Sequence, residues 1–173
     1  CLGGLNGGWT PGIAWSACKD PVTENLYVVI APSIRRFTPS PAGVGGTWSV
    51  LGPLPRELNS GAMAATAVDT RRNRLLWIKG YGPNQPYTCD LANGEWTARQ
   101  HPASTEKLAF DALSASLGMV YVQHQDAFLV RANAAGGRVY RIDAQTMAVS
   151  YLATAGGDRI SRGAVLSGED GVY

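Results

Sequence analysis

The fold is decided by the stretch Ala67-Val68-Asp69-Thr70-Arg71-Arg72-Asn73-Arg74-Leu75-Leu76-Trp77-Ile78. It contains an apolar run, a polar turn headed by an Asp, and a second apolar run, which is typical of a β-hairpin. Asp and Asn side chains bond the local backbone and tolerate left-handed geometry, so they favour a tight reversal. The second run is apolar without alternation, which indicates a strand buried on both faces.

The hairpin pattern recurs at 17–28 and 112–122, and again from 164 to 173. A second pattern places a large apolar residue six positions after the Asp of a Tyr-x-x-Asp motif, at 87–96 and 140–149. In the first copy, Phe37 and Trp48 take the two corresponding places. Together the patterns predict a unit of four strands with a period of about 45–52 residues, which is the signature of propeller blades.

We therefore predict an all-β, β-propeller-like fold of tandem four-stranded antiparallel blades in an incomplete ring. The predicted units are an N-terminal extension at 1–12, blade 1 at 13–55, blade 2 at 56–103, blade 3 at 104–157 and the first half of blade 4 at 158–173. Segment 104–115 is assigned to the first strand of blade 3, and we expect no helix longer than about two turns. Trp48, Trp77 and Trp96 are expected to be buried between sheets. Both end faces of the open ring are expected to be apolar, because blades pack on their neighbours.

These motifs resemble the kelch family, which includes the propeller domain of galactose-oxidase-type enzymes. The resemblance covers most of residues 13–173. The paired glycines that end the second strand in that family are replaced here by Ala31-Pro32, Lys79-Gly80 and Gln123-His124. Galactose-oxidase-like proteins bind copper through Tyr and His, but this chain carries no matching ligand motif.

Composition and charge argue against several classes of protein. The net charge is +2, and the basic residues occur as isolated pairs rather than as the stripe that phosphates require, so no nucleic-acid partner is expected. No apolar segment approaches the roughly 20 residues of a membrane span. The three cysteines form no CxxC pair, and Cys18 and Cys89 are expected to be buried free thiols. A fragment or a processed chain would each explain Cys1 as the first residue.

No catalytic constellation is apparent, and we expect neither a cofactor nor a bound metal. His101 is assigned to a connection between blades and His124 to a connection between the second and third strands, which emerge on one face of a propeller. The connections on that face are predicted to form the contact surface with a partner, because loops on a rigid scaffold carry function and Tyr and Arg anchor interfaces. The predicted contact residues are Arg35, Arg36, Arg56, Tyr81, Asn84, Gln85, His101, His124 and Asp126.

The sequence favours a non-catalytic interaction or structural module that belongs to a larger assembly, such as a secreted complex or a virus particle. Its partner would be a different protein or further copies of the chain that complete the propeller. Two alternatives stay open: a fragment of a carbohydrate-active or copper-oxidase-like propeller enzyme, and a lectin-like module that binds glycans through Tyr81 and loop Trp and Arg residues.

Overall fold

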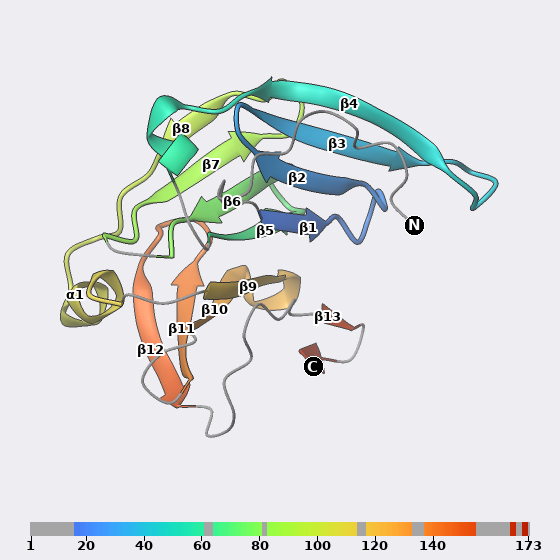
Figure 1. Cartoon of the computed structure of the whole chain (residues 1–173). Helices are drawn as coiled ribbons and strands as arrows, with labels where there is room; N and C mark the ends of the chain where they lie inside the picture. Colours follow the sequence, from blue (N-terminus) through green and yellow to red (C-terminus); the bar gives the residue numbers. More distant parts are fainter. Residues whose placement is uncertain are drawn as a thin grey trace.

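The computed structural model describes residues 16–60, 64–80, 83–113, 117–132 and 137–154, together with two short strands near the C-terminus. Most of these residues form three separate four-stranded sheets (Figure 1). In each sheet the strands are antiparallel and lie in the order in which they occur in the sequence. The fold is therefore a series of tandem meanders, as the sequence predicts.

The strands of the three sheets have the following bounds. Sheet 1 contains β1 (Ser16–Lys19), β2 (Leu26–Ile30), β3 (Ser33–Pro39) and β4 (Gly46–Pro53). Sheet 2 contains β5 (Ala65–Asp69), β6 (Arg74–Ile78), β7 (Pro86–Asp90) and β8 (Trp96–Ala98). Sheet 3 contains β9 (Leu117–Val122), β10 (Ala127–Ala132), β11 (Arg138–Asp143) and β12 (Val149–Thr154).

Short helical segments connect the strands. The 3₁₀ turn η1 (Arg56–Ser60) joins sheets 1 and 2, the helix α1 (Thr105–Asp111) joins sheets 2 and 3, and η2 (Gln123–Gln125) forms the turn between β9 and β10. The seven residues of α1 make about two turns, as expected. None of the helices in the described part of the chain has the length and apolar character needed to cross a membrane.

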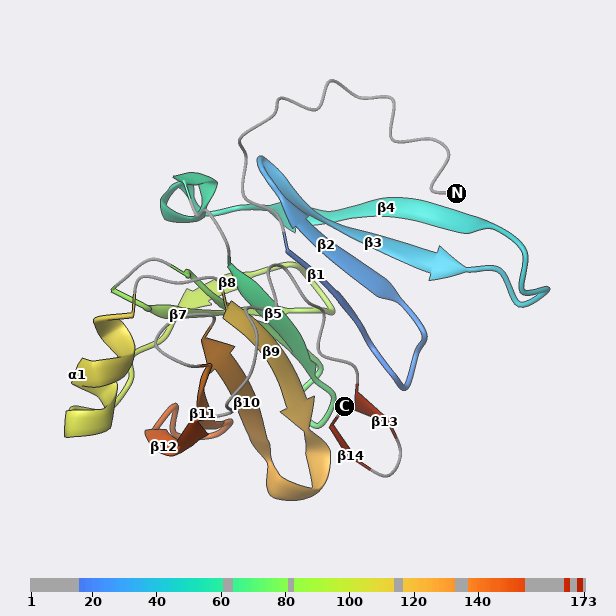
Figure 2. The ribbon, with the colours of Figure 1, turned by 60° about the horizontal axis from the view of Figure 1, so that its bottom comes forward.

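The first strand of each sheet lies next to the first strand of the following sheet. β1 packs beside β5, and β5 packs beside β9 (Figure 2). The last hairpin, β13 (Ser167–Gly168) with β14 (Gly171–Val172), places β13 beside β9 and so continues the series. Sheets that share an axis through their first strands are blades of a propeller, and the three sheets described here leave the ring open.

Four turns share one backbone conformation, and this conformation explains why Asp-headed turns recur in the sequence. Each begins with an Asp and has a residue with positive φ four positions later, and the pairs are Asp20 with Glu24, Asp69 with Asn73, Asp90 with Gly94, and Asp143 with Met147. The Asp side chain accepts a backbone N–H within its own turn, as from Val22 at 2.9 Å and Ala92 at 2.7 Å. The Asp fixes the turn locally, so the hairpins form at the same points of each unit.

Two apolar cores lie between the sheets. One core joins Tyr27, Val29 and Ile34 of sheet 1 to Leu75 and Trp77 of sheet 2, and the other joins sheet 2 to sheet 3 and to α1. Gly94 lies at the tip of the β7–β8 turn against β4, where a Cβ atom would collide with the Leu51 carbonyl. Its positive φ and this close approach both require glycine.

The expectation for the three tryptophans is confirmed only in part. Trp77 is 2% exposed, whereas Trp48 and Trp96 are half-buried. Trp48 stacks on Phe37 at 5.1 Å between ring centroids, on the long β3–β4 hairpin that projects from the body of the molecule (Figure 1). Its indole lies on the face of sheet 1 that points away from sheet 2, so the core between the sheets does not enclose it.

The strand assignment predicted for the third unit is wrong. Segment 104–115, expected to form the first strand, contains α1 instead, and the first strand is β9. The backbone N–H of Lys107 donates to the Ser104 hydroxyl at 3.0 Å, which caps α1, and Lys107 pairs with Asp111 one turn later. The second strand is β10, which lies within the segment predicted to connect the second and third strands.

Candidate functional site

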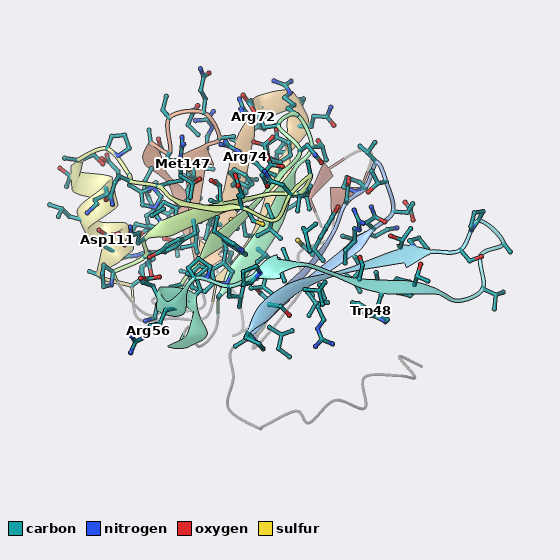
Figure 3. The ribbon with its side chains drawn as sticks, turned by 90° about the horizontal axis from the view of Figure 1, so that it is seen from above. Trp48, Arg56, Arg72, Arg74, Asp111 and Met147 are labelled. Carbon is teal, nitrogen blue, oxygen red and sulfur yellow. The ribbon has the colours of Figure 1, made fainter. Side chains whose placement is uncertain are left out.

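A cluster of charged side chains lies where sheet 2 meets sheet 3. This inter-sheet cluster consists of Asp69, Arg72, Arg74, Tyr121 and Asp126. Arg72 donates two hydrogen bonds to the Asp126 carboxylate, at 2.7 and 2.6 Å, and one to Asp69 at 3.0 Å. Arg74 donates to Asp69 at 3.0 Å, and the Tyr121 hydroxyl donates to Asp126 at 2.8 Å. Figure 3 shows Arg72 and Arg74 beside each other at this junction.

The cluster connects turns of different sheets rather than enclosing a reactive centre. Asp69 is fully buried in the β5–β6 region, whereas Asp126 belongs to the β9–β10 turn of the next sheet. Arg74 also donates to the Ala144 carbonyl in the β11–β12 turn. The hydrogen bonds between Arg72 and Asp126 hold the pKa of Asp126 well below its usual range and raise the pKa of Arg72 above its own. The Arg72–Asp126 pair is therefore a charge-assisted link between sheets 2 and 3.

His101 is a second polar group enclosed between sheets 2 and 3. Its ring is 6% exposed, with Nδ1 2.7 Å from the Met147 carbonyl and Nε2 3.2 Å from the Asn84 carbonyl. Asn84 is fully buried and donates to the Phe110 carbonyl at 2.5 Å, which ties the segment before β7 to α1. Burial lowers the pKa of His101 below its ordinary value, although the two carbonyls oppose that shift.

His101 and His124 do not form a joint site. His124 lies in η2, in the turn between the first and second strands of sheet 3, and is exposed with Gln125 beside it at 3.3 Å. The sequence prediction places it between the second and third strands, and the difference follows from the wrong strand assignment in this unit. Asp126 moves with it to the same turn.

We expect His101→Ala to lower the free energy of unfolding by about 1–3 kcal/mol, because it leaves a buried backbone carbonyl without its donor. The matched change His124→Ala should stay within about 0.5 kcal/mol, as at other exposed positions. Because the pKa of His101 is lowered in the folded state, the neutral ring contributes stability above the unfolded pKa of about 6.5. That contribution is lost as the pH falls from about 6.5 through the folded-state pKa. Urea unfolding at pH 7.5 and pH 5.5 measures both effects, and equal losses for the two histidines would contradict the assignment.

Arg35 and Arg36 lie in β3, which corrects the prediction that they belong to the connection before it. The β2–β3 turn is limited to Ala31 and Pro32, so both arginines pair across the sheet, Arg35 with Val50 and Arg36 with Ser49. Because neighbouring residues of a strand point to opposite faces, Arg35 shares the face of Trp48 and Arg36 shares the face of Tyr27. The two side chains therefore lie on different faces of sheet 1.

The other predicted contact residues differ in how exposed their side chains are. Arg56 is exposed in η1 (Figure 3). Gln85 is half-buried before β7, and both residues lie in the predicted connections. Tyr81 lies outside the described residues. Asn84 and His101 occupy predicted connections too, but their side chains are buried and make intramolecular hydrogen bonds. In the structure, both side chains therefore join sheets 2 and 3.

Cys18 and Cys89 are free thiols. Cys89 is a buried free thiol, as expected, whereas Cys18 is half-buried, and burial raises the pKa of each thiol to about 12. Such thiols stay protonated at neutral pH and are poor nucleophiles. Within the described ranges, no group of three or more His, Cys, Asp or Glu side chains gathers closely enough to hold a metal ion.

Comparison with known proteins supports the fold. No family model and no curated protein matches the chain, so the kelch resemblance is not confirmed. A chain in a crystal structure of a nidogen/laminin complex matches with a TM-score of 0.55 and 15% identity, over 82% of this chain and 48% of that one. An auxiliary nutrient binding protein from Bacteroides ovatus matches with a TM-score of 0.54 and 16% identity, over 91% and 35%. Both neighbours are propeller-like, and this chain spans less than half of either.

Proposed function

We propose that the chain is a non-catalytic β-propeller module that binds protein and works inside a larger assembly, such as a secreted complex or a virus particle. The observation that carries this proposal is the open ring: three blades lie around one axis, and they correspond to less than half of two longer propeller-like chains. Blades stabilise each other through their faces, so an open series of them favours a partner.

The surface proposed for contact with the partner consists of η1 and the connection between β6 and β7. Arg56 in η1 is exposed, and the segment 79–85 between β6 and β7 contains Gln85 and Tyr81. Arg and Tyr are enriched among the residues that dominate interface energies. One of the two neighbours above was solved as part of a complex between two proteins, nidogen and laminin, which is consistent with a binding role for this fold.

The proposal is tested by isolating the tagged chain from its native host without denaturation and measuring the mass of the particle. We expect a mass well above the 18.3 kDa of the chain, with a second polypeptide in fixed stoichiometry. Arg56→Glu should weaken that association at least several-fold, because charge reversal at an interface introduces repulsion. Recovery of the chain only as an 18.3 kDa monomer would contradict the proposal.

A further inference from the structure

One face of sheet 1 is equivalent to the faces by which sheets 2 and 3 each pack on the sheet before them. This outer face consists of Leu26, Val28, Arg35, Phe37, Trp48 and Val50. Cross-strand pairing defines its equivalents: the row Leu26, Phe37 and Trp48 matches the row Leu75, Cys89 and Trp96 in sheet 2 and the row Phe128, Ile142 and Val149 in sheet 3. The next row, Val28, Arg35 and Val50, matches Trp77, Tyr87 and Ala98, and then Val130, Tyr140 and Tyr151.

In sheets 2 and 3 these rows are covered by the sheet before. Leu75 and Trp77 share a core with Tyr27 and Val29 of sheet 1, and Phe128 shares a core with Leu76 and Ile78 of sheet 2. In sheet 1 none of the corresponding residues belongs to a core formed by the described part of the chain. Its Leu26, Val28, Phe37 and Trp48 are half-buried and Val50 is 65% exposed. Sheet 1 therefore repeats a blade-packing face without the blade that would cover it.

Arg35 gives this face a charge that its equivalents lack. It takes the place of Tyr87 in sheet 2 and Tyr140 in sheet 3, at the centre of an apolar surface. Its Nε is buried and has no hydrogen-bond partner in the structure as described. A covering sheet would bury the guanidinium further, and a buried Arg is tolerated only when a carboxylate or a similar acceptor pairs with it. The covering sheet must therefore supply an acidic side chain opposite Arg35.

Two candidate covers, residues 1–15 and a second copy of this chain, do not fit that requirement. Residues 1–15 contain no Asp or Glu. The outer face of sheet 3, which a second copy could offer, carries Arg131 at the position of Ile78 in sheet 2, and Arg141 beside Leu129. The carboxylate of Asp143 on this face already pairs with Arg141 at 3.5 Å and accepts hydrogen bonds within its own turn. The arginines of this face would repel Arg35. This face of sheet 3 thus mixes apolar and charged side chains. The second predicted end face, on 158–173, lies largely outside the described residues.

We propose that the outer face of sheet 1 binds a further four-stranded propeller blade that residues 1–173 do not form, with an apolar face and a carboxylate opposite Arg35. This inference rests on the proposed function and adds to it a second contact site, distinct from the Arg56 surface, with a partner class. The blade continues the packing that joins sheet 1 to sheet 2, on the side where β2, β3 and β4 present the repeated rows. Binding buries Trp48 and Val50 and leaves the Arg56 surface free for other contacts.

The first test compares Val50→Glu with Val22→Glu, a matched pair because Val22 is also exposed (70%) but lies in the β1–β2 turn. In the isolated chain, the apolar dye 8-anilinonaphthalene-1-sulfonate should bind the outer face. We expect Val50→Glu to lower dye fluorescence several-fold and to release the partner from the native assembly, with Val22→Glu unchanged in both assays. A discrete dimer of the isolated chain that Val50→Glu abolishes would instead assign the face to a second copy. A several-fold rise in dye binding on deleting residues 1–15 would assign it to the chain's own N-terminus.

The second test identifies the carboxylate. In the native assembly carrying Arg35→Lys, a water-soluble carbodiimide should couple the new amine to the facing Asp or Glu as an amide, and mass spectrometry locates it. We expect the linked peptide to lie outside residues 1–173 and to alternate apolar and polar residues as a strand does, and we expect no coupling for Arg36→Lys, on the opposite face. An intact assembly in which Val50→Glu has no effect and Arg35→Lys does not couple would overturn the inference while leaving the proposed function in place. Absence of any assembly would overturn both.

Discussion

Trp77→Ala is expected to lower the free energy of unfolding by about 3–5 kcal/mol, the usual cost of truncating a large core aromatic. The indole is 2% exposed in the core between sheets 1 and 2, and it meets Tyr87 edge-on at 5.9 Å between centroids. The cavity that Ala would leave lies between two β-sheets that cannot easily close on it. Denaturant unfolding of the isolated chain measures the change.

Trp48→Ala provides the matched control for this prediction. Trp48 is half-buried on the outer face of sheet 1 and packs mainly on Phe37, so its loss in the isolated chain should cost less than half as much as the loss of Trp77. If the two substitutions destabilised the chain equally, the assignment of inner and outer faces to sheet 1 would be wrong.

The second large effect is expected for Arg72→Met, which removes the hub of the inter-sheet cluster. The substitution leaves the fully buried Asp69 with Arg74 and the backbone N–H of residue 72, and it leaves Asp126 with Tyr121 and the more distant Arg71. We expect a loss of about 2–3 kcal/mol, below the range for fully buried pairs because the Arg72 and Asp126 side chains are 29% and 25% exposed. Arg71→Met is the control: Arg71 is 46% exposed and 3.9 Å from Asp126, so it should change stability by about 0.5 kcal/mol or less.

The pH dependence of the stability lost in Arg72→Met tests the same cluster independently. A carboxyl whose pKa is depressed in the folded state contributes stability above its ordinary pKa of about 3.9, and that contribution is lost as the pH falls below it. The pKa of Asp126 is depressed chiefly by Arg72. The stability difference between the unmodified chain and Arg72→Met should therefore be full at pH 6 and shrink between about pH 4 and pH 2. A difference that does not vary with pH would show that Arg72 acts by packing alone.

Much of the architecture could be predicted because its signals are local. An Asp-headed turn between apolar runs specifies a hairpin through its own side-chain hydrogen bonds, and the Tyr-x-x-Asp motifs end β7 and β11. The third unit is misassigned from sequence because the segment 112–118 has the apolar-then-polar pattern of a strand followed by a turn. The signals that correct it are present, namely a Ser104 cap before α1 and the apolar run Ala127-Phe128-Leu129-Val130 in β10.

The polar sites are less predictable because they depend on contacts distant in the sequence. The local charges of the β5–β6 turn indicate an ion pair between Asp69 and Arg72, but Asp126 lies 54 residues from Arg72. The sequence places His101 in a loop, although its partners Asn84 and Met147 bury it. Only the packing of one sheet on the next brings these groups together. The repeat, by contrast, makes the outer face of sheet 1 recognisable once the strand register is known.

Light scattering on the isolated chain, combined with dye binding, tests the central claim that these blades are an open part of a propeller. The account predicts a chain that binds 8-anilinonaphthalene-1-sulfonate and whose average mass rises above 18.3 kDa with concentration, because an apolar blade face is uncovered. A monodisperse 18.3 kDa monomer that unfolds cooperatively and binds no dye would show that the chain completes its own fold, and would contradict the account.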